Sequence, residues 1–199
     1  GDVTKLGFDT IEARASDGFV SQIPASLVMQ GASGGSVAWI AIEDPKSPWP
    51  NLPDQKTSAG PFYLVWQYPE RSSVGSEQWP YALVALTGVE DPVRRWPQLA
   101  VDPSLPAGAA EHRGQAVFIK NCIPCHRLNG AGESDTGPDL GQPMNVTTYM
   151  TARGIHALIR DPKSVRTWPG QQMMGFDSEK IPDADIDALI AFLASKAKR

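Results

Sequence analysis

The feature that most constrains this chain is one pentapeptide, Cys122-Ile123-Pro124-Cys125-His126, which holds both cysteines among the 199 residues. The spacing Cys-x-x-Cys-His is the attachment signature of c-type haem. Two thiols three positions apart can add to the two vinyl groups of one porphyrin, and the adjacent histidine is then placed to bind the iron. The motif predicts one covalent haem c, anchored by Cys122 and Cys125 and ligated by His126.

Three other interpretations fit the two cysteines alone. A thioredoxin-like dithiol also has the Cys-x-x-Cys spacing, at the start of a helix that follows a strand. A zinc site would normally need two further Cys or His ligands, and only His112 and His156 remain. A structural disulfide between residues three apart would close a very small loop.

The flanking sequence favours the haem. Residues 110–121 have the pattern of an amphipathic helix with Val117 and Phe118 on its apolar face. Downstream, a carbonyl at Pro138 is a candidate acceptor for the Nδ1–H of His126, a bond that would orient the ligand. Further helices are predicted over residues 149–160, ended by Asp161-Pro162, and over 183–196.

Residues from about 107 to 199 resemble a bacterial class I cytochrome c domain. The resemblance rests on the haem motif, on Gly-Pro-x-Leu at 137–140, and on a late Met followed three residues on by Phe. Gly114 and Phe118 match the family's N-terminal helix, which crosses a C-terminal helix carrying Phe192. The resemblance implies an all-α fold and a role in electron transfer.

The same resemblance implies a methionine as the sixth iron ligand. The family's local pattern resembles Met-Pro-x-Phe, and alignment on Phe176 places Met173 in the ligand position, with Met174 where Pro usually stands. Met174 is therefore the alternative, and the remaining candidates are an open site, His156, Met144 and Met150. A Met/His pair raises the reduction potential of haem iron and favours an electron carrier, whereas an open position would allow catalysis. Arg166 and Trp168, just before this loop, are candidates for contact with the porphyrin ring or a propionate, and equally for ordinary loop residues.

The first hundred residues differ in character and predict a mostly-β (α+β) domain. Strand-like runs separated by Gly, Pro and Asp turn signals occupy residues 8–13, 19–23, 37–42, 62–66 and 81–87. Five of the six tryptophans lie in this half, at positions 39, 49, 66, 79 and 96. We expect them mainly to fill the core, with an exposed docking surface as the alternative.

This half is similar, more weakly, to part of the sulfite-oxidase-type molybdopterin domain. The similarity covers about 60 residues, from Asp17-Gly18-Phe19 to the run Gly60-Pro61-Phe62-Tyr63-Leu64-Val65. That family holds molybdenum through a cysteine thiolate, and both cysteines here are assigned to haem. The resemblance implies a reduced relative of the domain without its cofactor.

The predicted organisation is a mostly-β domain at 1–100, a Pro-rich linker at 101–109 and an all-α cytochrome c domain at 110–199. Residues 1–106 carry a net charge of −5, residues 107–199 carry +1, and the whole chain carries −4. No basic excess suggests nucleic-acid binding. No apolar run approaches the roughly 20 residues that span a bilayer.

These features predict an electron-transfer cytochrome rather than an enzyme. It would accept electrons from a dehydrogenase and pass them to a respiratory cytochrome or oxidase. Covalent haem attachment is associated with extracytoplasmic assembly, so we expect a periplasmic or extracytoplasmic location after removal of a signal peptide. A haem enzyme with an open or weakly ligated iron and a redox sensor module are the alternatives.

Overall fold

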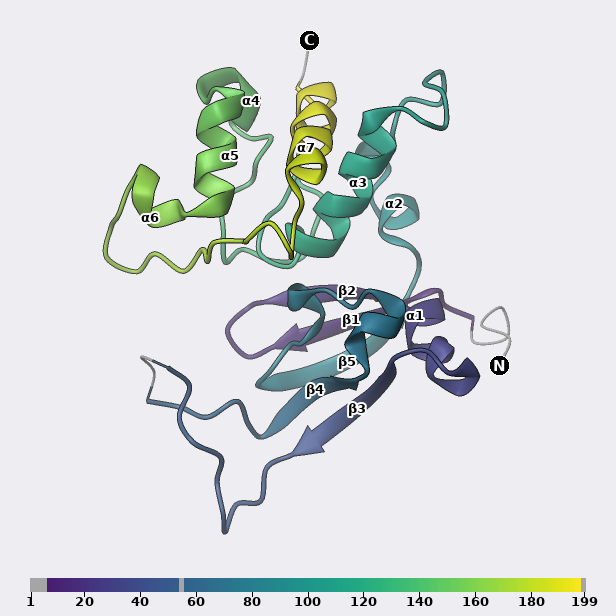
Figure 1. The fold of residues 1–199 in the computed structure, drawn as a ribbon, viewed down its shortest axis with the longest axis vertical. Helices are drawn as coiled ribbons and strands as arrows, with labels where there is room; N and C mark the ends of the chain where they lie inside the picture. The colour runs from purple at the N-terminus through teal and green to yellow at the C-terminus, as the bar shows by residue number, and fades with distance from the viewer. Residues whose placement is uncertain (1–6, 54–55, 198–199) are drawn as a thin grey trace. The chain divides into compact units, whose positions relative to one another are not determined.

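The computed structural model describes residues 7–53 and 56–197, and the chain divides into two compact units, Gly1–Arg95 and Trp96–Arg199 (Figure 1). Leu99 is fully buried among the apolar side chains of the second unit. The segment around it, which the sequence analysis placed at the end of the first domain, therefore packs with the second unit.

The first unit is rich in strands, as predicted. A three-stranded antiparallel sheet has the order β2-β1-β5, and a separate antiparallel pair has the order β3-β4. The five predicted runs all form strands, with ends displaced by two residues or fewer. The bounds are Thr10–Ala15 for β1, Val20–Pro24 for β2, Val37–Ile42 for β3, Phe62–Gln67 for β4 and Leu83–Val89 for β5.

Short helices that the sequence analysis did not predict lie between and after these strands. Each is one turn or little more, so it shows no helical periodicity in the sequence. They are α1 (Ala25–Met29), η2 (Gln30–Ser33), η3 (Pro69–Ser72), η4 (Ser76–Gln78) and α2 (Pro92–Arg95). Ile23, Leu27, Leu64 and Trp66 form the core of this unit. The indole N–H of Trp66 donates to the Gln78 carbonyl at 2.8 Å, which satisfies its only polar group.

A partly buried charged network lies on the three-stranded sheet. The Glu12 carboxylate accepts hydrogen bonds from Arg95 at 2.8 Å, from Arg14 at 3.0 Å and from Gln22 at 3.2 Å. Burial alone would raise the pKa of Glu12, but these donors outweigh it and lower the pKa below its ordinary value. The network joins α2 to the sheet.

The described part of the second unit is helical, which confirms the all-α prediction. Its elements are η5 (Pro97–Leu99), α3 (Ala110–Asn121), α4 (Val146–Tyr149), α5 (Ala152–Arg160), α6 (Pro162–Val165) and α7 (Asp183–Ser195). The single helix predicted over 149–160 is wrong at its start. Met150 is extended, and Thr151 caps a new helix by accepting a hydrogen bond from the Gly154 N–H at 3.1 Å.

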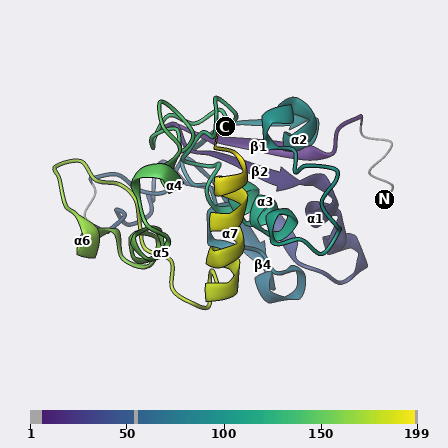
Figure 2. The ribbon, with the colours of Figure 1, turned by 90° about the horizontal axis from the view of Figure 1, so that it is seen from above.

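The centre of this unit is the crossing of α3 and α7 (Figure 2). The rings of Phe118 and Phe192 lie 5.8 Å apart between centroids. A Cβ atom at Gly114 would fall on the Ala188 carbonyl and lie 2.6 Å from the Cβ of Phe192. The absence of a side chain at this position therefore sets how closely the two helices approach.

Candidate haem-binding site

The predicted attachment motif forms a tight turn at the C-terminal end of α3. The Cys122 N–H donates to the Phe118 carbonyl, and the His126 N–H then donates to the Cys122 carbonyl at 2.8 Å. Ile123 and Pro124 are fully buried, whereas Cys122, Cys125 and His126 are each partly exposed. The two intervening residues anchor the turn in the core, and the two cysteines and the histidine keep part of their surface exposed.

Segment 137–140 runs beside this turn and holds the histidine. The Gly137 N–H donates to the Cys125 carbonyl at 2.7 Å, and the Leu140 N–H donates to the Arg127 carbonyl at 2.8 Å. The Nδ1 atom of His126 lies 2.8 Å from the Pro138 carbonyl oxygen. Because that oxygen can only accept, Nδ1 carries the proton and Nε2 keeps its lone pair for a metal ion.

The surroundings of the imidazole also favour its neutral form. Burial lowers the pKa of His126, and the hydrogen bond to the Pro138 carbonyl only partly opposes this, so the pKa lies below its usual value. A Cβ atom at Gly137 would come within 2.6 Å of Nδ1. The glycine therefore leaves the space in which the ring lies, a role that the sequence analysis did not assign.

A single carboxylate organises the loop around this segment. Asp139 accepts hydrogen bonds from four backbone N–H groups, those of Asn129, Gly130, Gly141 and Gln142, at 2.7–3.1 Å. Asn129 and Gly130 both have positive φ, so the turn requires residues that tolerate that region. Asp139 was not predicted as a site residue, although an Asp next to Gly-Pro is a familiar loop signal.

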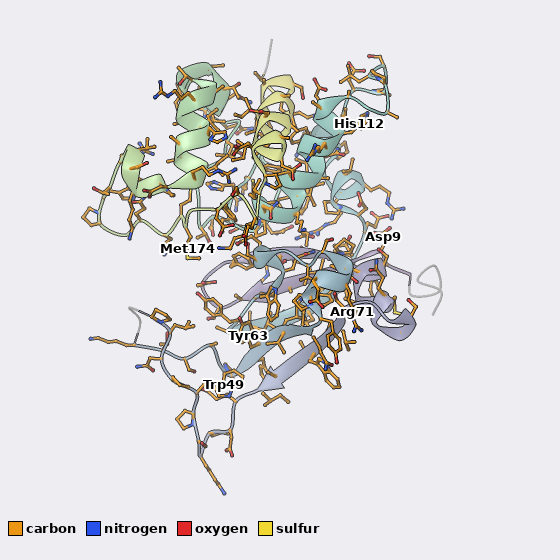
Figure 3. The ribbon with its side chains drawn as sticks, viewed as in Figure 1. Asp9, Trp49, Tyr63, Arg71, His112 and Met174 are labelled. Atoms are coloured by element: carbon orange, nitrogen blue, oxygen red, sulfur yellow. The ribbon has the colours of Figure 1, made fainter. Side chains whose placement is uncertain are left out.

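The two candidate methionines differ in their surroundings. Met173 is partly buried and packs against the core of the unit, whereas Met174 is 75% exposed. Figure 3 marks Met174 on the loop that precedes α7. The next residues are tied to α5, because the Phe176 N–H donates to the Ile159 carbonyl at 2.9 Å and Arg160 donates to the Phe176 carbonyl at 2.8 Å.

Arg166 and Trp168 contact each other. The guanidinium carbon of Arg166 lies 4.7 Å from the centroid of the Trp168 ring, and both side chains are exposed. The structure brings this pair together on the same loop as Met173, and their contact with a haem stays a prediction.

The remaining histidines and methionines have other surroundings in the structure. His156 is on α5, with its Nε2 atom 3.3 Å from the Asp183 carboxylate. Met144 is exposed, and Met150 packs against the core. His112 is on α3 and is half-buried (Figure 3).

The family model for cytochrome c matches residues 111–197. The matched segment contains the haem motif, the Gly-Pro-x-Leu segment and both candidate methionines. The C-terminal half of the chain is therefore a cytochrome c domain, which makes it a haem-binding, electron-transfer module. No curated protein and no solved structure matches the chain.

The residues present fit a covalently bound haem. Two partly exposed cysteines lie three residues apart, and the imidazole beside them holds the Pro138 carbonyl through Nδ1, which leaves Nε2 for an iron. Within residues 7–53 and 56–197, no cluster of three or more His, Cys, Asp or Glu side chains could hold a separate metal ion, and no helix is both long and apolar enough to cross a membrane.

Proposed function

We propose that this protein is a single-haem c-type electron carrier whose iron is ligated by His126 and Met173. The observation that carries the proposal is the turn at residues 122–126, which presents two thiols and one oriented imidazole together. When bound, haem supplies a one-electron Fe(III)/Fe(II) couple.

The protein's own residues then have separate roles. Cys122 and Cys125 hold the porphyrin through thioether bonds. The Pro138 carbonyl fixes the imidazole of His126 and raises its basicity as a ligand. Arg166 and Trp168 are proposed to lie beside the ring or a propionate, where a guanidinium would offset negative charge.

Met173 is the better sixth ligand on packing grounds. Met173 packs against the same core as Cys122, so it would be available to ligate an iron bound at the motif turn. Met174, with three quarters of its surface exposed, lacks such packing. Ligation by both histidine and methionine leaves no open coordination site, which suits electron transfer rather than substrate turnover.

We further propose an extracytoplasmic location, with a dehydrogenase as electron donor and a respiratory cytochrome or oxidase as acceptor. Support comes from the association of covalent haem attachment with assembly outside the cytoplasm. The N-terminal unit is proposed as a docking module, and its relation to the molybdopterin-domain fold stays a prediction.

Optical spectroscopy of the purified holoprotein tests the ligation. We expect a reduced c-type spectrum, one haem per chain, and in the oxidised protein the weak long-wavelength band that reports methionine–iron ligation. Met173→Ala should abolish that band, and the matched variant Met174→Ala should keep it. The reverse pattern would identify Met174 as the ligand, and high-spin ferric haem that binds cyanide rapidly would favour the enzymatic alternative.

A further inference from the structure

Strand β3 presents a free apolar edge. It pairs with β4 on one side, and none of the other strands formed by residues 7–53 and 56–197 pairs with its second side (Figure 1). Its six residues, VAWIAI, contain no charge and no proline. Edge strands of this kind invite pairing with another chain, and natural proteins usually protect them with charges, proline or bulges. This strand has no charge and no proline, so its open side is a candidate for pairing with another chain.

The hydrogen bonds between β3 and β4 show which residues of β3 direct their backbone groups toward the open side. The Glu43 N–H donates to the Pro61 carbonyl at 2.9 Å, in continuity with the β3–β4 register. Backbone N–H and C=O groups alternate in direction along an antiparallel ladder. Those of the odd-numbered residues of β3 therefore point toward β4. The backbone groups of Ala38, Ile40 and Ile42 therefore point away from β4, toward the open side.

The exposed side chains on this ribbon are large and apolar. The exposed fraction is 58% for Trp39, 69% for Ile42, 39% for Ile40 and 42% for Phe62, which lies directly opposite Ile42 on β4. At about 200 Å² for a fully exposed large apolar residue, the three exposed side chains on β3 itself, Trp39, Ile40 and Ile42, expose about 330 Å² per protomer. Two copies would therefore bury about 700 Å² of side-chain surface, the size of a weak, transient interface.

We propose that the free edge of β3 pairs with the same edge of a second copy of this chain, in an antiparallel, two-fold symmetric arrangement. The backbone N–H and C=O groups of Ile40 point toward the open side, so two copies can form hydrogen bonds in a register centred on Ile40. Ile40 then lies opposite its own copy, Trp39 opposite Ala41, and Ala38 opposite Ile42. Each remaining large side chain meets a small one across the interface, which lets the two faces interdigitate.

The charges next to β3 also favour antiparallel pairing with a second copy of the chain. Glu43 and Asp44 follow β3 directly. In the antiparallel register Glu43 lies opposite Val37 of the second copy. In a parallel arrangement, Glu43 and Asp44 would each lie beside the same residue of the second copy. Like charges directly opposite one another destabilise a strand pair. The proposal does not depend on the haem or on its ligation.

Sedimentation of the full-length holoprotein tests this pairing. We expect the wild-type chain to shift from monomer to dimer as its concentration rises from about 1 to 500 µM, the range in which a small, weak interface is populated. Ile40→Lys and Ile40→Glu each place two like charges face to face and should weaken dimerisation at least about 100-fold. Because Ile40 faces its own copy, an equimolar mixture of the two variants should recover dimers.

The mixture separates loss of the interface from misfolding, and far-UV circular dichroism checks each variant separately. Tyr149→Lys, which changes an exposed aromatic residue on α4, is the control and should dimerise like the wild type. A wild-type chain that stays monomeric across the range would overturn the proposal. So would dimers that survive both Ile40 variants, or folded variants whose mixture remains monomeric.

Discussion

Gly114 determines how closely α3 and α7 cross, and Gly114→Ala is the sharpest perturbation of that contact. The new Cβ would fall on the Ala188 carbonyl and lie 2.6 Å from the Phe192 Cβ. Both neighbours are fixed to a helix backbone, so neither can rotate away. Overpacking of this kind costs about 1–3 kcal/mol, and backbone obstruction places the cost at the upper end.

Helix propensity acts in the opposite direction, because Gly→Ala in a helix interior gains about 1 kcal/mol. We therefore expect the free energy of unfolding to fall by about 2 kcal/mol. Gly154→Ala in α5 is the matched control, since its Cβ would meet only the Thr151 hydroxyl at 3.3 Å and the end of the Met150 side chain at 3.6 Å. It receives the same propensity gain without the helix crossing and should be stabilised by up to about 1 kcal/mol.

Haem absorbance reports unfolding of the cytochrome unit alone, so denaturant titrations followed in the Soret band measure the relevant transition. The two variants should differ by about 2–3 kcal/mol, or roughly 10–20 °C in Tm for a domain of this size. If Gly114→Ala and Gly154→Ala agree to within a few tenths of a kcal/mol, the close approach at Gly114 does not limit the packing of the helices.

Two further predictions concern the ligand and the first unit. Gly137→Ala should displace the His126 ring from the Pro138 carbonyl, make the ligand less basic and raise the reduction potential, measured by redox titration; an unchanged potential would contradict this role. Glu12→Gln should destabilise the first unit by about 2–3 kcal/mol in tryptophan-monitored unfolding, because Arg95 loses a partly buried partner. Since the folded state lowers the pKa of Glu12, this contribution is present above about pH 4.5 and is lost as the pH falls through the folded value; equal acid sensitivity of Glu12→Gln and wild type would refute it.

The elements that the sequence revealed are those with a local signal. Helix α3 begins and ends as its apolar pattern predicts, and β3 matches its predicted range at both ends. The segment 149–160 was harder, because its periodicity continues through Met150 while the actual break depends on one hydroxyl, that of Thr151. Propensity averages over several residues and does not detect a single capping contact.

The candidate haem site also contains residues with a local sequence signal and residues that only the folded structure reveals. Cys122, Cys125 and His126 are recognisable because their chemistry needs a fixed local spacing. Gly137 and Asp139 act through contacts with residues about ten positions away, which only the folded loop brings together. The choice between Met173 and Met174 likewise depends on burial. The sequence alone does not show which of two adjacent methionines is the more buried.

Asp139 connects a surface turn to the segment that holds His126, the proposed iron ligand. Its carboxylate ties the surface turn at Asn129–Gly130 to the residue that follows Pro138 in the chain. A substitution or a bound partner that shifted this turn would move the Pro138 carbonyl and so change how strongly it holds the imidazole of His126. Under the proposed ligation, variation at the exposed turn would adjust the reduction potential over evolution without any change in the residues proposed to bind the iron or the porphyrin.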